Sequence, residues 1–179
     1  MLNERVPIKN ADASQWVSAY IGLGSNLATE LGSPTQHIEQ ALQTLGEHER
    51  VRHVQASSFY ASAPMGPQDQ PDFVNAVAKF ETTLLPFELL ALCQKLEQQA
   101  KRERIRHWGE RSLDVDILLY GQQQISEPLL SVPHIGLTER NFVLLPLREL
   151  SPQLLIAGQP ISSYALSEDW TGLKLLNDK

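Results

Sequence analysis

The order of strand-like and helix-like segments is the feature of this sequence that most restricts its fold. Four segments have the apolar run or two-residue alternation of a β-strand, and two have the apolar repeat of an amphipathic helix. The strand segments are 19–23, 51–60, 73–82 and 114–120, and the helix segments are 34–46 and 86–99. Pro34, preceded by Ser33 as a cap, and Pro86 begin the helices. The order β-α-β-β-α-β predicts an α+β fold with a ferredoxin-like core, in which helices pack on one face of an antiparallel-rich sheet.

The chain continues beyond this core with C-terminal additions. Residues 122–134 are expected to form a hairpin-like excursion. A third helix is expected from Glu139 to Leu150, with Thr138 as its cap. The tail after this helix has one weak helical stretch, at 161–166, and no other pattern.

Charge and composition disfavour several classes of protein. The net charge of −6 argues against a nucleic-acid partner or an anionic membrane. The sequence has no long apolar run and no signal peptide, and its single cysteine, Cys93, allows no disulfide within the chain. Residues 1–17 lack periodicity and are expected to be a weakly ordered extension, with residues 18–179 as a single domain. We therefore expect a cytoplasmic protein without a membrane or nucleic-acid partner.

Segment 101–120 joins a cluster of basic side chains to two carboxylates. The basic residues are Arg102, Arg104, Arg106, His107 and Arg111. Asp114 and Asp116 then share one face of the expected strand, whereas Val115 and Ile117 share the other. Carboxylates two residues apart on a strand lie about 6.5–7 Å apart along the chain and can converge on one or two hard cations. Because arginine binds phosphate oxygens and magnesium bridges them, this stretch predicts a site for polyphosphate chemistry.

Each of these patterns also has a plainer interpretation. Alternating aspartates are often the solvated face of a strand, and arginines after a helix often compensate its dipole. Asn75 and Phe73 could bind a flat heterocycle, or they could be an exposed amide and an aromatic at the edge of the core. Gly22-x-Gly24 lacks the third glycine of a dinucleotide fingerprint, and the sequence has no P-loop motif. A non-catalytic nucleotide- or RNA-binding module and a metal-dependent phosphohydrolase are therefore alternatives to an ATP-dependent transferase.

Four segments, in the same order along the chain, resemble the 6-hydroxymethyl-7,8-dihydropterin pyrophosphokinases of folate biosynthesis. They are AYIGLGSNL (19–27), SSFYASAPMGPQDQPDFVNAV (57–77), HWGERSLDVDILLY (107–120) and VPHIGLTERNFVLLPL (132–147). The resemblance covers residues 18–155. It implies a ferredoxin-like fold and an ATP-dependent diphosphotransferase. Such an enzyme transfers pyrophosphate from MgATP to the hydroxymethyl group of the pterin and releases AMP.

The resemblance also implies roles for individual residues. Catalytic roles are implied for Arg102, Arg111, Asp114 and Asp116, and the two aspartates are expected to hold two Mg²⁺ ions. ATP binding is implied for Gln94, Glu97, Arg104, Trp108, Arg111, His134 and Arg140. Pterin binding is implied for Ser62, Met65, Phe73, Asn75 and Phe142, with the two aromatics on either side of the ring. The implied partners are ATP and 6-hydroxymethyl-7,8-dihydropterin, and we expect the enzyme to be a monomer.

Four positions depart from the commoner pattern of this family. Phe73 stands where tyrosine is frequent, which keeps the stacking face and removes a hydroxyl. His107 and Glu110 replace an arginine and a proline on either side of Trp108 and Gly109. Ile135 stands where an aromatic residue is often found. None of these changes touches the carboxylate pair, so we expect an active enzyme in which the kinetics of the basic loop are altered at most.

Overall fold

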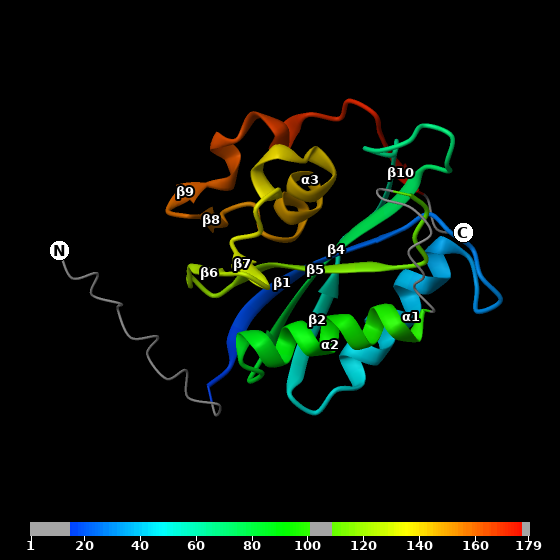
Figure 1. Ribbon diagram of the computed structural model, residues 1–179. Coiled ribbons are helices and arrows are strands. Elements are labelled where there is room, and N and C mark those ends of the chain that lie inside the picture. Colours follow the sequence, from blue (N-terminus) through cyan, green and yellow to red (C-terminus); the bar gives the residue numbers. More distant parts are fainter. Residues whose placement is uncertain (1–14, 101–108, 177–179) are drawn as a thin grey trace.

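The computed structural model describes residues 15–100 and 109–176, and its centre is an antiparallel sheet (Figure 1). The strands of this sheet are β1 (Val17–Ser25), β2 (Val51–Ala56), β3 (Phe59–Ser62), β4 (Phe73–Thr82), β5 (Asp114–Tyr120) and β10 (Leu173–Leu176). Their order is β10-β3-β4-β1-β5, and β2 also pairs with β4. With β2 and β3 taken as one interrupted strand, this is the order of the predicted ferredoxin-like core, which is confirmed.

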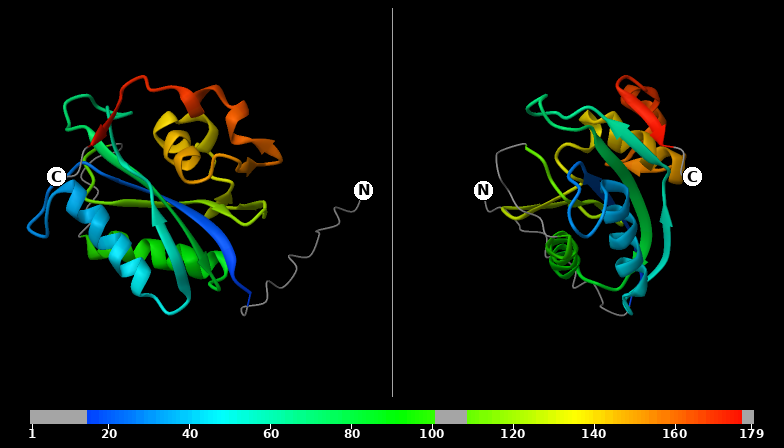
Figure 2. Two further views of the ribbon diagram at one scale, coloured as in Figure 1. Left: turned by 180° about the vertical axis from the view of Figure 1, so that it is seen from behind. Right: turned by 90° about the vertical axis from the view of Figure 1, so that its right-hand side faces the viewer.

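Helices cover both faces of the sheet (Figure 2). The helices α1 (Pro34–Glu47) and α2 (Pro86–Gln99) pack on one face, as predicted for the core. The third helix, α3 (Asn141–Leu150), packs on the other face together with the C-terminal segment. The prediction of helices on one face therefore holds for the core helices and not for α3. In the two described ranges, no helix has the length and the apolar character needed to cross a membrane.

The alternation along β4 and β5 explains how both faces are buried. Ala78 and Phe80 of β4 belong to the core formed with α1 and α2, whereas Val77 belongs to the smaller core under α3. Val115 and Ile117 of β5 also belong to the core on the side of α1 and α2. Because side chains alternate along a strand, the two aspartates of β5 face the side of α3.

Both core helices begin at the predicted prolines, and local hydrogen bonds fix these starts. The Ser33 Oγ accepts a bond from Gln36 N at 3.2 Å, and the Gln36 side chain accepts one from Ser33 N at 2.8 Å. Before α2, Leu85 N donates to Glu88 Oε1 at 3.1 Å. These bonds satisfy backbone groups that the helices leave unpaired, so the sequence around each proline determines where its helix starts.

Segment 51–60, predicted as one strand, forms two strands that are separated at Ser57. The Ser57 N–H donates to Val77 O at 2.8 Å, and the Ser57 Oγ accepts a bond from Val77 N at 2.9 Å. The hydroxyl therefore takes the place of a backbone carbonyl in the ladder, and the strand is interrupted without leaving Val77 unpaired. After the interruption, β3 continues two residues past the predicted end, to Ser62.

The third helix begins later than predicted. The expected hairpin is present as β6 (Ile125–Glu127) and β7 (Leu130–Val132). Thr138, predicted as the helix cap, lies instead within a short 3₁₀ helix, Leu137–Glu139. The extended backbone of Arg140 separates that 3₁₀ helix from α3.

The two ends of the described chain are more regular than the sequence predicted. The tail forms β8 (Leu155–Ile156), β9 (Gln159–Pro160), the 3₁₀ helices Ile161–Ser163 and Ala165–Glu168, and β10. The strand β10 extends the sheet by pairing with β3. This strand has only four residues, and no pattern in the sequence around it predicts the pairing. At the other end, Val17 was assigned to the weakly ordered extension and belongs to β1, whereas residues 1–14 lie outside the described ranges.

The Tyr120 hydroxyl links β5 to the segment before α2 and should contribute measurably to stability. Tyr120 is 1% exposed, and its hydroxyl donates to Leu84 O at 2.7 Å. Tyr120→Phe leaves this carbonyl buried and unpaired, so we expect the free energy of unfolding to fall by about 1–3 kcal/mol. Urea denaturation measures the change. Tyr164→Phe is the control because its bond to Ile156 O is longer, at 3.3 Å; an equal loss in the two variants would contradict the prediction.

Candidate active site

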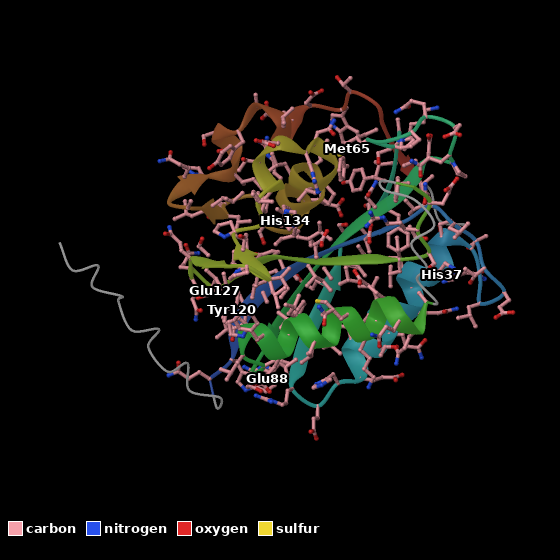
Figure 3. The ribbon with its side chains drawn as sticks, in the orientation of Figure 1. His37, Met65, Glu88, Tyr120, Glu127 and His134 are labelled. Carbon is pink, nitrogen blue, oxygen red and sulfur yellow. The ribbon has the colours of Figure 1, made fainter. Side chains whose placement is uncertain are left out.

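A cavity of about 510 Å³ lies beside the edge strand β5, with α2 on one side and α3 on the other. Every predicted site residue that the structure describes lines this cavity. They are Ser62, Met65, Phe73, Asn75, Gln94, Glu97, Arg111, Asp114, Asp116, His134, Arg140 and Phe142. Arg102, Arg104 and Trp108 lie outside the described residues. In Figure 3, the labelled Met65 and His134 lie on the α3 side of the sheet, whereas Glu88 lies on the side of α2.

Two glycines of β1 form the floor of the cavity. Gly22 and Gly24 alternate with Leu23, which is buried in the core under α1 and α2. In the sheet, Gly24 lies opposite Asn75 of β4 on one side and Asp114 of β5 on the other. A Cβ at Gly24 would lie 3.4 Å from Asn75 Oδ1, so a larger residue there would fill the space above the strand. The glycines therefore keep the centre of the cavity open.

The wall beside β4 is suited to a flat heterocycle. Asn75 is 7% exposed, and its Nδ2 donates to Ser62 Oγ at 2.6 Å. This bond fixes the orientation of the amide, whose Oδ1 lies next to Gly24 on the floor. Phe73 lines the cavity from β4 and Phe142 lines it from α3. A fixed amide and aromatic rings from two elements could bind the edge and the faces of a planar ring.

The wall beside β5 carries the two carboxylates. Arg111 Nη1 lies 3.0 and 3.2 Å from the two oxygens of Asp114. Glu97 of α2 accepts a hydrogen bond from Val115 N at 3.0 Å, which fixes the backbone between the aspartates. The side chain of Asp114 is 25% exposed and that of Asp116 is 53% exposed. Asp114 is therefore not part of a fully solvated strand face. The wall therefore presents two carboxylates on a fixed strand, with the guanidinium of Arg111 beside the first of them.

His134 presents a ring N–H on the same side of the cavity. Its Nδ1 accepts a bond from Gly136 N at 3.0 Å, so Nε2 carries the proton of the neutral ring. This Nε2 lies 3.9 Å from Asp116 Oδ2. Burial lowers the pKa of His134; the Asp116 carboxylate opposes this shift, and the positive charge of Arg140 adds to it. Burial therefore favours the neutral form of His134, in which the Nε2–H can donate a hydrogen bond into the cavity.

The donor set of the cavity fits a magnesium ion that shares its ligands with a substrate. Asp114 and Asp116 supply the hard oxygen ligands that Mg²⁺ prefers. In the described part of the chain, no group of three or more His, Cys, Asp or Glu side chains could hold a metal by itself. Magnesium is commonly bound by one or two carboxylates, with water and substrate phosphates as its other ligands. The pair is thus compatible with the predicted metal role.

Asn26 is a site-forming residue that the sequence patterns did not indicate. It is 2% exposed, and its Oδ1 accepts a bond from Arg111 N at 2.8 Å. Its Nδ2 donates to Gln70 Oε1 at 3.0 Å and to Pro71 O at 2.9 Å. One amide therefore joins the loop after β1 to the loop before β4 and to Arg111. The only signal in the sequence was a polar residue directly after a strand, which is common to many turns.

Comparisons with known proteins identify close relatives of this chain. A family model described as 7,8-dihydro-6-hydroxymethylpterin-pyrophosphokinase (HPPK) matches residues 20–152. The 2-amino-4-hydroxy-6-hydroxymethyldihydropteridine pyrophosphokinase of Haemophilus influenzae is 46% identical over 145 residues, which are 81% of this chain and 88% of that protein. The protein of the same description from Pseudomonas aeruginosa is 45% identical over 135 residues, or 75% of this chain and 81% of that protein.

Solved structures show the same fold at low sequence identity. A triple mutant of Plasmodium falciparum HPPK-DHPS matches 89% of this chain with a TM-score of 0.67 and 14% identity. The wild-type HPPK-DHPS with pteroate matches 86% of this chain with a TM-score of 0.65 and 14% identity. The chain spans 44% of each of these longer chains. The family match over most of the chain and the identity to the curated relatives show that this chain belongs to the HPPK family.

Proposed function

We propose that this chain transfers the pyrophosphoryl group of ATP to the hydroxymethyl oxygen of 6-hydroxymethyl-7,8-dihydropterin and releases AMP, as a step of folate biosynthesis. The observation that best supports this reaction is the arrangement of the cavity. Asn75 lies across the glycine floor of β1 from Asp114, so a pterin and a polyphosphate can lie side by side above one strand. An RNA-binding module would present a basic surface, whereas this chain has a net charge of −6 and its cavity is lined by Asp114 and Asp116.

The pterin half of the site consists of two aromatic rings, an oriented amide and Met65. The ring lies between Phe73 and Phe142, and its polar edge bonds to the amide of Asn75. Because Ser62 already orients that amide, little conformational freedom is lost when the pterin binds. Met65, which is 57% exposed, lines the entrance of this half.

The phosphate half consists of arginines and the aspartate pair. Arg111 and Arg140 bind phosphate oxygens, and the Nε2–H of His134 donates a further hydrogen bond. Asp114 and Asp116 would hold two Mg²⁺ ions. When bound, magnesium neutralises the charge that develops on the transferred phosphates. Gln94 and Glu97 line the same half from α2, and Glu97 also holds the β5 backbone.

The chain contributes to catalysis mainly by positioning the two substrates relative to each other. The hydroxymethyl group of the pterin releases its proton to water, and its oxygen forms a bond to the β-phosphorus. The bond from the β-phosphorus to the oxygen shared with the α-phosphate breaks, and AMP leaves. This displacement needs no covalent intermediate on the protein. The one cysteine of the chain is unsuited to act as a nucleophile. Cys93 is 1% exposed, and burial raises the pKa of its thiol, with the charges of Asp116 and Glu97 adding to the shift. Holding the two substrates in line is then the main task of the cavity.

We also propose that the protein acts as a monomer in the cytoplasm, with residues 18–179 as one domain. Cys93 is buried, and its thiol suits a reducing compartment. Sedimentation equilibrium at micromolar concentration tests the oligomeric state.

Product analysis tests the reaction and its metal dependence together. We expect AMP to form from ATP only when the pterin and Mg²⁺ are both present, and to disappear in EDTA. Chromatography separates AMP from ADP and phosphate. ADP as the product would indicate simple kinase chemistry, and phosphate released without the pterin would indicate a hydrolase; either result would contradict the proposal.

The metal role of β5 is tested by Asp116→Asn. The amide keeps the shape of the side chain and removes its charge, so we expect kcat/KM to fall about 100-fold or more. Glu127→Gln removes a carboxylate on the exposed hairpin strand β6, outside the cavity, and should leave kcat/KM unchanged. Titration with Mn²⁺ in the presence of an ATP analogue provides a second measurement. Equal activity of the two variants would exclude Asp116 as a metal ligand.

The stacking role of Phe73 is tested by two substitutions. Phe73→Ala removes the aromatic face, so we expect the KM for the pterin to rise about tenfold while the KM for ATP changes little. Phe73→Tyr keeps the face and should bind the pterin about as well as the wild type. Initial rates at varied pterin and saturating MgATP give these constants. Wild-type kinetics in Phe73→Ala would remove the ring from the pterin site and favour a hydrolase.

A further inference from the structure

Asn141, the first residue of α3, is held by the C-terminal segment. Its Nδ2 donates to Asp169 O and to Thr171 O, each at 2.9 Å. Thr171 N in turn donates to Asp169 Oδ1 at 2.9 Å, which closes this turn on itself. The two carbonyls use both hydrogens of one amide, so the side chain of Asn141 has a single orientation.

The turn at 169–171 is also fixed to the opposite wall of the cavity. Directly after it, β10 pairs with β3, and Leu173 lies opposite the cavity residue Ser62. Within the turn, Trp170 packs on Tyr60 of β3 with their ring centroids 5.8 Å apart. The turn therefore connects β3, on the pterin side of the cavity, to the first turn of α3. Its residues lie beyond residue 152, where the match to the family model ends.

The two residues on either side of Asn141 are the ones proposed to bind the substrates from the side of α3, Arg140 the phosphates and Phe142 the pterin. Arg140 and Phe142 both line the cavity, and the Arg140 Cζ lies 5.9 Å from the centroid of the Phe142 ring. The helix begins only after Arg140, whose backbone is extended and whose carbonyl accepts bonds from Val143 N and Leu144 N. The directions of both side chains therefore depend on how the first turn of α3 is held.

We propose that Asn141 is a positioning residue, which orients Arg140 and Phe142 for the substrates through the turn at 169–171. This inference rests on the proposed function, because it takes Phe142 as a pterin contact and Arg140 as a phosphate contact. The two amide bonds keep the first turn of α3 in its binding-competent arrangement before any substrate arrives. When they are lost, apparent affinity falls in proportion to the population of that arrangement.

The kinetic test compares Asn141→Ala with Arg148→Gln in the full chain. Arg148 bonds to Glu168 at 2.7 Å near the other end of α3, so its variant breaks a link to the same C-terminal segment away from the cavity. We expect the KM for the pterin to rise about fivefold to tenfold in Asn141→Ala, the size expected when one or two hydrogen bonds no longer hold the competent state, with kcat changing less than about twofold. Arg148→Gln should keep the wild-type KM. Equal KM values in all three proteins would overturn the inference.

Asn141→Asp separates positioning from stability. Its carboxylate would face two carbonyl oxygens, so the pterin KM should rise at least as much as in Asn141→Ala. An acidic residue in the first turn interacts favourably with the helix dipole, so the Tm of Asn141→Asp should lie above that of Asn141→Ala. A KM that follows the Tm across the variants would indicate a merely structural role and overturn the inference.

Hydrogen exchange on the unliganded proteins gives a readout that does not need turnover. The amides of Val143 and Leu144 should exchange faster in Asn141→Ala than in the wild type or Arg148→Gln. Unchanged exchange would overturn the inference, as would an unchanged pterin KM despite faster exchange. If the wild type formed no pterin-dependent AMP, the proposed function would fail, whereas faster exchange would still support Asn141 as the residue that holds the turn.

Discussion

The pairing of β1 with β4 on one side and β5 on the other is the interaction on which the candidate site depends. Its register places Gly24 between Asn75 and Asp114, and Gly22 opposite Asp116. The wall for a heterocycle and the wall for phosphates are therefore neighbours across the two glycines of β1, which have no side chains to fill the space between them. A shift of the register by one residue would turn the aspartates into the core, so the buried residues that fix the register also fix the site.

Three asparagine side chains then hold the parts that the sheet alone does not position. Asn26 joins the loops after β1 and before β4 to Arg111. Asn75 is oriented by Ser62 within the cavity. Asn141 attaches the first turn of α3 to the C-terminal segment. An amide both donates and accepts, so the single buried side chain of Asn26 can satisfy backbone groups from two segments far apart in the sequence.

The sequence predicted those features that depend on neighbouring residues. The alternation in β4 and β5 and the cap at Ser33 before Pro34 were visible as patterns, and the order of such segments was enough to predict the ferredoxin-like core. The interruption at Ser57 and the strand β10 depend on partners that are remote in the chain, so no local pattern predicted them. The pattern of residues alone allowed two interpretations of the aspartate pair, a metal site and the solvated face of a strand. Its assignment came from the family resemblance, whereas Asn26 had no distinguishing signal.

A crystal structure with Mg²⁺, a non-hydrolysable ATP analogue and 6-hydroxymethylpterin would test the central claim most directly. We predict that the pterin ring lies between Phe73 and Phe142 with its edge on Asn75. We predict also that the polyphosphate lies across the floor of β1 from Asn75, with metal bound to Asp114 and Asp116. A pterin bound elsewhere, or a metal that contacts neither aspartate, would contradict the proposal that both substrates meet above the glycines of β1.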